Sequence, residues 1–156
     1  MDTLLPSKPF HQAKAQLSDV MSEVVRSHHP FLVDRNRGKE LMVLMSAPDL
    51  LRMLEGFSFS TQVSVSEGEF VFHLPELNLV AGGETFDAGL DDLVEIAEKH
   101  AEVLMDRLDF YAQTDRAAQI PWALRIALTP AHERRELLVP RPEAPAAEPQ
   151  AAVAAA

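Results

Sequence analysis

The chain has 156 residues, 47% of them hydrophobic and 24% charged, which is enough apolar material for a core and excludes wholesale disorder. It has no cysteine, which excludes disulfides, thiol catalysis and thiolate metal sites and fits a reducing cytoplasm. No apolar stretch approaches the roughly 18 residues of a membrane-spanning helix, and the first residues lack the features of an export signal. We therefore expect a cytoplasmic protein without a membrane partner.

The net charge of −10 argues against general nucleic-acid binding, but it is unevenly distributed. Residues 1–56 hold seven basic and seven acidic residues and are neutral. Residues 57–115 hold two basic and thirteen acidic residues, whereas residues 116–156 carry a net charge of +1. The first two segments therefore suit partners of opposite charge.

The first segment begins with an amphipathic pattern. From residue 10 onward, apolar side chains recur at spacings of three and four, which predicts a helix. Pro30 should stop it, because the residue before a proline avoids the α region. The apolar runs 31–33 and 41–45 then flank the polar residues 34–40, which predicts a hairpin of two short strands.

A second helix is predicted after the hairpin. Ser46 is placed to cap it, Asp49 to complete a capping box, and Gly56 to stop it. Pro48 falls in the first turn, where a missing N–H costs nothing. Residues 1–56 are therefore expected to form a helix–hairpin–helix module.

The second segment changes to the period of a strand. Residues 57–65 alternate apolar and polar, residues 70–74 do so again after a turn, and residues 77–81 read as a third strand. Gly82-Gly83 should end this third strand. These patterns predict a three-stranded antiparallel meander.

A long acidic helix is predicted to follow the meander. Thr85 can cap it, and an apolar stripe at helical spacing continues to Tyr111. Asp87, Asp91 and Asp92 lie near its start, where carboxylates favour the helix dipole. The fold class predicted for the chain is therefore α+β, with this second domain over residues 57–111.

The C-terminal arm, residues 112–139, has an ambiguous middle at residues 116–128. Its apolar residues alternate as in a strand, yet others fit a helix, and the abundance of Ala and Leu favours the helix. Thr129-Pro130 is predicted to cap a short final helix. Residues 140–156 are rich in Pro and Ala and are expected to be a disordered tail.

The sequence carries no pattern typical of an active site. The six histidines show no metal-ligand spacing, and Gly82-Gly83 lacks the motif of a phosphate loop. A metal-dependent nuclease needs carboxylates that converge from neighbouring strands, whereas the carboxylates here lie on a helix face. We therefore predict a non-enzymatic protein with no catalytic residue, no metal and no cofactor.

Three segments of the neutral module carry a family resemblance. They are residues 11–20 (HQAKAQLSDV), 30–39 (PFLVDRNRGK) and 43–46 (VLMS). In this order they resemble the N-terminal DNA-binding module of Phd/YefM antitoxins over residues 8–55. The family has an arginine where this chain has Lys14, which keeps the positive charge for phosphate but loses bidentate base contacts.

A second resemblance covers residues 57–111. Residues 69–78 (EFVFHLPELN) and 82–90 (GGETFDAGL) are similar to the HicB antitoxin fold, a degenerate ribonuclease-H-like sheet. That fold agrees with the missing catalytic carboxylates. Together the two resemblances imply a composite type II antitoxin.

The resemblance implies two partners for the first module. Phd/YefM modules pair as homodimers and bind operator DNA through basic residues of the first helix and the hairpin turn. Carried over to this chain, that role falls on Lys14 and Arg35, and we add their neighbours Lys8, Arg37 and Lys39. A dimer would present this set twice and repress its own operon.

The rest of such a protein binds its cognate toxin, commonly a small basic ribonuclease of the RelE type. An acidic domain can steer a basic toxin, and apolar side chains of the arm can anchor it. The candidate anchors are Trp122, Leu124, Ile126 and Leu128, although Trp122 equally suits packing against the long helix. The alternative is a stand-alone transcriptional regulator whose middle domain binds a ligand or dimerises.

Overall fold

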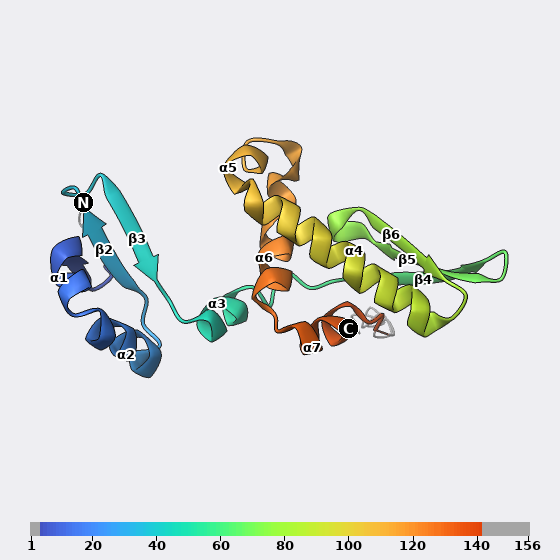
Figure 1. Cartoon of the computed structure of the whole chain (residues 1–156), viewed down its shortest axis with the longest axis horizontal. Helices are drawn as coiled ribbons and strands as arrows, with labels where there is room; N and C mark the ends of the chain where they lie inside the picture. Colours follow the sequence, from blue (N-terminus) through green and yellow to red (C-terminus); the bar gives the residue numbers. More distant parts are fainter. Residues whose placement is uncertain (1–3, 142–156) are drawn as a thin grey trace, which may run out of the picture. The chain divides into compact units, whose positions relative to one another are not determined.

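The computed structural model describes residues 4–141, and the chain divides into two units, Met1–Phe57 and Ser58–Ala156 (Figure 1). Each contains a three-stranded sheet, and the described residues include seven α-helices. The predicted mixed α+β class is confirmed. None of the helices in the described range is long and apolar enough to cross a membrane.

The first unit contains the predicted hairpin. Its elements are β1 (Ser7–Pro9), α1 (Phe10–Ala15), α2 (Leu17–Ser27), β2 (Phe31–Arg35), β3 (Glu40–Leu44) and α3 (Ala47–Met53). In the sheet, β2 lies in the centre, parallel to β1 and antiparallel to β3. Helices α1 and α2 pack on one face through a small core, made of Ala13, Val20, Val24, Phe31, Val33 and Leu44.

Two features of this unit differ from the prediction. The single helix expected from residue 10 is interrupted at Gln16, where φ is −118° and ψ is 29°. The apolar spacing continues across the break, so the periodicity gave no sign of it. Strand β1 was not predicted, because Ser-Lys-Pro has no strand pattern of its own and forms a strand by pairing in parallel with β2.

The second unit contains the predicted meander and long helix. Its main elements are β4 (Gln62–Ser66), β5 (Glu69–Leu74), β6 (Leu79–Gly83), α4 (Phe86–Asp106), α5 (Leu108–Tyr111), α6 (Ile120–Leu128) and α7 (Ala131–Leu138), with 3₁₀ turns η1 (Pro75–Leu77) and η2 (Asp115–Gln119). The strand order is β4-β5-β6, antiparallel throughout. Thr85 caps α4 as predicted, because its Oγ1 accepts from the amide of Ala88 at 3.1 Å.

The strand boundaries differ from the prediction for non-local reasons. The first strand begins at Gln62 rather than Phe57, because side chains hold the preceding residues: the amide of Ser60 donates to Glu76 Oε1 at 2.9 Å, and Trp122 Nε1 donates to the carbonyl of Ser58 at 3.1 Å. The third strand includes Gly82 and Gly83 instead of ending before them. Helix α4 ends at Asp106, short of the predicted end at Tyr111.

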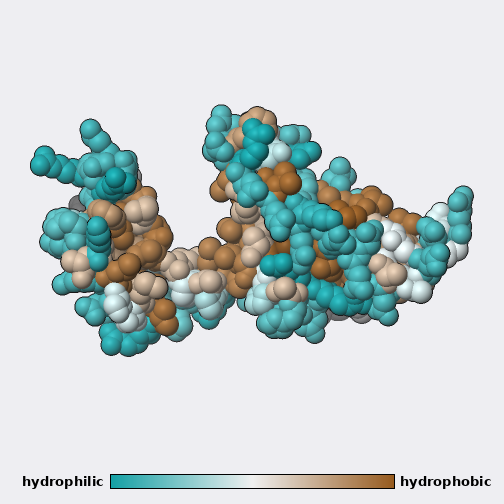
Figure 2. All heavy atoms as spheres, viewed as in Figure 1, coloured by the Kyte–Doolittle hydropathy of each residue, from teal (hydrophilic) through white to brown (hydrophobic). Residues whose placement is uncertain are grey.

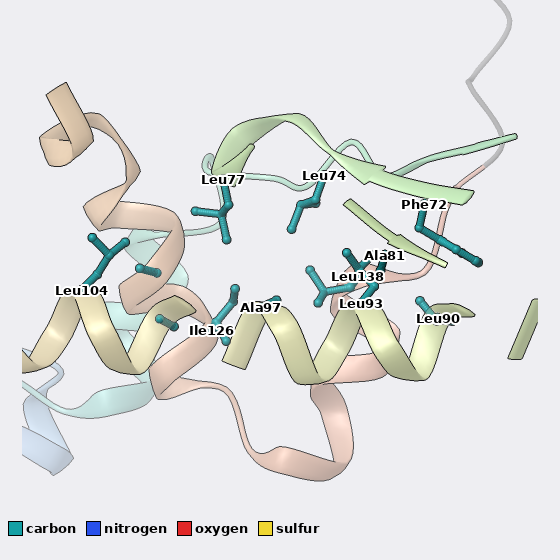
Figure 3. Close-up of a cluster of buried hydrophobic side chains, with 12 residues drawn as sticks. Phe72, Leu74, Leu77, Ala81, Leu90, Leu93, Ala97, Leu104, Ile126 and Leu138 are labelled. Atoms are coloured by element: carbon teal, nitrogen blue, oxygen red, sulfur yellow. The ribbon is translucent and has the colours of Figure 1, made fainter. Parts of the chain in front are cut away.

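The core of the second unit lies between the sheet, α4 and the C-terminal helices (Figure 3). It is made of Phe72, Leu74, Leu77, Ala81, Leu90, Leu93, Ala97, Ala101, Leu104, Ala123, Ile126 and Leu138. The helical interpretation of the arm is therefore the correct one, because α6 and α7 supply three of these side chains.

The predicted cap of the last helix is wrong. Thr129 Oγ1 donates to the carbonyl of Arg125 at 2.7 Å, and Pro130 occupies the N-cap position of α7 without a side-chain bond. The predicted disordered tail lies almost entirely outside the described residues, which end at residue 141.

Candidate interaction surfaces

Four of the five predicted DNA-binding residues lie around the hairpin turn and the strand beside it. Arg35 ends β2, Arg37 and Lys39 lie in the turn, and Lys8 lies in β1, one residue before the register pair of Pro9 with Asp34. The guanidinium carbon of Arg35 is 5.6 Å from the ring centroid of Phe10 at the start of α1. The parallel pairing of β1 thus brings basic residues from two separate segments together.

The turn itself has a defined backbone geometry. Asn36 and Arg37 have positive φ angles of 58° and 55°, and Gly38 follows at 84°. The carboxylate of Asp34 accepts from the amide of Gly38 at 2.6 Å, which closes the turn. A basic side chain on this turn is therefore presented from a fixed backbone.

The predicted basic residues differ in whether their charged groups have a partner within the chain. Arg35 pairs with Glu40 at 3.3 Å, and Lys8 Nζ donates to Gln16 Oε1 at 2.9 Å. Within residues 4–141, Arg37, Lys39 and Lys14 make no ion pair, and all three are exposed. Lys14 lies in the last turn of α1.

An exposed apolar sheet face was missed by the sequence analysis. Val33 faces the helices and pairs in the register with Met42, so the residues on either side of Met42, Leu41 and Val43, point to the opposite face. Val43 is 54% exposed, and Figure 2 shows hydrophobic residues gathered on the surface near β3. The signal was present in the sequence: residues 41–44 are apolar without alternation, which is typical of a strand covered on both faces.

A hydrogen-bonded cluster joins the end of α2 to the start of α3. The hydroxyl of Ser46 caps α3 by accepting from the amide of Asp49, as predicted, and donates to the carboxylate of Asp49. His28 Nδ1 lies 3.1 Å from the same carboxylate, and Arg52 lies 3.5 Å from it. The Ser46 hydrogen bond, with His28 and Arg52, lowers the pKa of Asp49 below its usual 3.8.

The predicted toxin anchors lie on a helix rather than on a strand. Ile126 is only 1% exposed and belongs to the core, and Trp122 packs against that core while it donates to Ser58. Leu124 and Leu128 are half-buried and lie four residues apart on one side of α6. Of the four, Leu124 and Leu128 are best placed to meet a partner.

Arginines of the arm pair with carboxylates on one side of α4, which sequence reasoning missed. Arg134 Nη1 pairs with Glu98 at 2.9 Å, and Arg135 pairs with both Asp87 and Asp91. The two arginines lie about 40 residues from these partners in the sequence. No local pattern connects residues at such a separation.

A bound metal ion would require side chains in the described part of the chain that could together ligate it. Residues 4–141 contain no group of three or more His, Asp or Glu side chains that could hold a metal ion.

The comparison with solved structures found a similar fold. A solved structure from Syntrophomonas wolfei subsp. wolfei, described as the antitoxin part of a proposed toxin/antitoxin system, is similar in fold with a TM-score of 0.74. The identity is 19%, and the match covers 88% of this chain and 99% of that one. No curated protein matches this chain.

A family model places the chain more directly. The model of the PHD-like family, described as antitoxins of toxin–antitoxin systems of the RelE/RelB kind, matches residues 4–139. The chain belongs to this family of antitoxins. The expectation of a non-enzymatic regulatory protein with a cognate toxin as partner is thereby confirmed.

Proposed function

We propose that this chain is a type II antitoxin of the cytoplasm, which neutralises a small basic RelE-like ribonuclease by direct binding and represses its own operon as a homodimer. The observation that carries the proposal is the family match over residues 4–139, which spans both units. The charge distribution supports it, because a neutral unit with an exposed basic turn precedes a unit with a long acidic helix. Such a division suits DNA and a basic protein as separate partners.

Toxin binding is assigned to the second unit. The exposed carboxylates of α4 would steer a basic toxin, and Leu124 and Leu128 would supply apolar contact. Trp122 and Ile126 would then act mainly by holding α6 in place, since both pack in or against the core.

Co-expression tests the proposal. The product of the small basic open reading frame that neighbours this gene should arrest growth when expressed alone, and growth should return when this chain is co-expressed. The two proteins should also purify as a stoichiometric complex. Normal growth without this chain, together with retained operator binding, would favour a stand-alone transcriptional regulator.

DNA binding is assigned to the first unit as a dimer. The outer sheet face with Leu41 and Val43 would be covered by a second copy, which places two basic turns on one operator. The similarity to Phd/YefM modules supports this assignment. The meander followed by α4 likewise supports a HicB-like scaffold for the second unit.

Replacing Lys39 by glutamine should weaken operator binding and reduce its salt dependence. Each homodimer loses two cations, so the slope of log K against log salt should become less steep by about 2, given roughly 0.9 per phosphate contact. Electrophoretic shifts over a salt series would measure it. Lys99→Gln, which removes a cation from α4, is the matched control and should leave the slope unchanged. An unchanged slope for Lys39→Gln would show that Lys39 of the turn does not contact the DNA.

A further inference from the structure

Five carboxylates lie along one flank of α4. They are Asp87, Asp91, Glu98, Glu102 and Asp106, at spacings of four and seven residues, which correspond to one side of a helix. We call this set the acidic flank. It follows the helix from its first turn to its last residue, so both ends of α4 present the same kind of surface.

Arginines of the chain itself occupy the first part of the acidic flank. Arg135 pairs with Asp87 and Asp91, and Arg134 pairs with Glu98. Arg134 Nε also donates to the carbonyl of Thr129 at 2.9 Å, and its side chain is only 23% exposed. The acidic flank is therefore a surface on which guanidinium groups are bound and partly buried.

The last part of the acidic flank has no such partner. Glu102 and Asp106 are exposed, and neither makes an ion pair with any residue from 4 to 141. They border a hollow of about 260 Å³ between α4 and α6, where Glu98 and Arg134 also lie. The other side chains that line it are apolar: Ala101, Met105, Ile126 and Ala127.

We propose that this hollow binds an arginine or lysine side chain of the toxin. The partner's identity rests on the function proposed above. The aliphatic stem would lie on the apolar lining near Met105, and the charged end would meet Glu102 and Asp106. The partner's cation would thus continue the series that Arg135 and Arg134 begin.

Charge complementarity selects this occupant over a second copy of the chain. The segment 57–115 that contains α4 holds thirteen acidic residues against two basic ones, so two such surfaces repel each other. A basic toxin is attracted to it, and an apolar hollow beside the two carboxylates of Glu102 and Asp106 matches the mixed character of an arginine side chain.

The double variant Glu102→Gln/Asp106→Gln tests the proposal. Calorimetric titration with the purified product of the neighbouring basic reading frame should show affinity reduced by about tenfold or more, with weaker salt dependence. Glu67→Gln/Glu69→Gln removes two exposed charges, one from the β4–β5 turn and one from the start of β5, and should bind like the unmodified chain. Ala127→Leu, which narrows the hollow without changing its charge, should also weaken binding.

The outcomes distinguish the inference from the function on which it rests. Both Gln variants should melt like the unmodified protein, because neither removes an ion pair of the described residues. If the unmodified chain binds the toxin and Glu102→Gln/Asp106→Gln binds equally well, the hollow is not the toxin's site and the proposed function stands. If the unmodified chain forms no complex, the proposed function fails and the inference fails with it. Association of the chain with itself that requires these carboxylates would overturn the choice of occupant.

Discussion

Replacing Gly83 by alanine is expected to destabilise the second unit by about 3 kcal/mol or more, since overpacking at a close contact costs 1–3 kcal/mol and backbone has little freedom to yield. A Cβ at Gly83 would lie 2.8 Å from the carbonyl carbon of Ala88 and would also contact the backbone of Gly89. The end of β6 and the first turn of α4 approach each other at this point. The substitution should push them apart and disturb the core between them.

Urea unfolding would measure this effect. The chain has one tryptophan, Trp122, and its indole is hydrogen bonded within the second unit, so its fluorescence reports on that unit. Gly82→Ala is the matched control, because a Cβ there would meet only a carbonyl oxygen at an ordinary 3.4 Å. Equal stability of the Gly82 and Gly83 variants would show that β6 and α4 are not so close in solution.

The role of Gly83 illustrates what sequence patterns can and cannot predict. The sequence pattern predicted Gly82-Gly83 as a turn that ends a strand. In the structure both glycines belong to β6, and the missing side chain of Gly83 lets the backbones of β6 and α4 come close. The hairpin, the meander and the capped start of α4 were predicted correctly, because each depends on neighbouring residues. Strand β1 and the late start at Gln62 depend on distant partners, which no local period encodes.

The same distinction applies to the candidate surfaces. The basic turn was named because Arg35 follows from the resemblance to Phd/YefM modules, and Arg37 and Lys39 are its neighbours in the sequence. The coverage of the acidic flank by Arg134 and Arg135 was not found, because α7 reaches α4 only after the chain has folded back. Ile126 was named as an anchor from an alternating pattern, but helix geometry turns it into the core.

The second large effect is expected for a substitution on the outer face of the first unit's sheet. Replacing Val43 by glutamate should convert the proposed dimer into a monomer, because a charge would be buried without a partner at the interface. A homodimer contacts both half-sites of an operator, whereas a monomer contacts one. Operator affinity should therefore fall by about 100-fold or more, since each 1.4 kcal/mol lost is a factor of ten.

Light scattering and operator shifts together test this result. Met21→Glu is the matched control: Met21 is 56% exposed, close to the 54% of Val43, but it lies on α2, which packs on the other face of the sheet. Val43→Glu should fold, because Val43 lies outside the core of its unit, and it should still bind the toxin through the second unit. If the dimer persists in Val43→Glu but is lost in Met21→Glu, the dimer interface lies on α2 and not on the outer face of the sheet. Loss of toxin binding in Val43→Glu would instead mean that the two units do not act separately, because the changed side chain is far in sequence from every residue of the acidic flank.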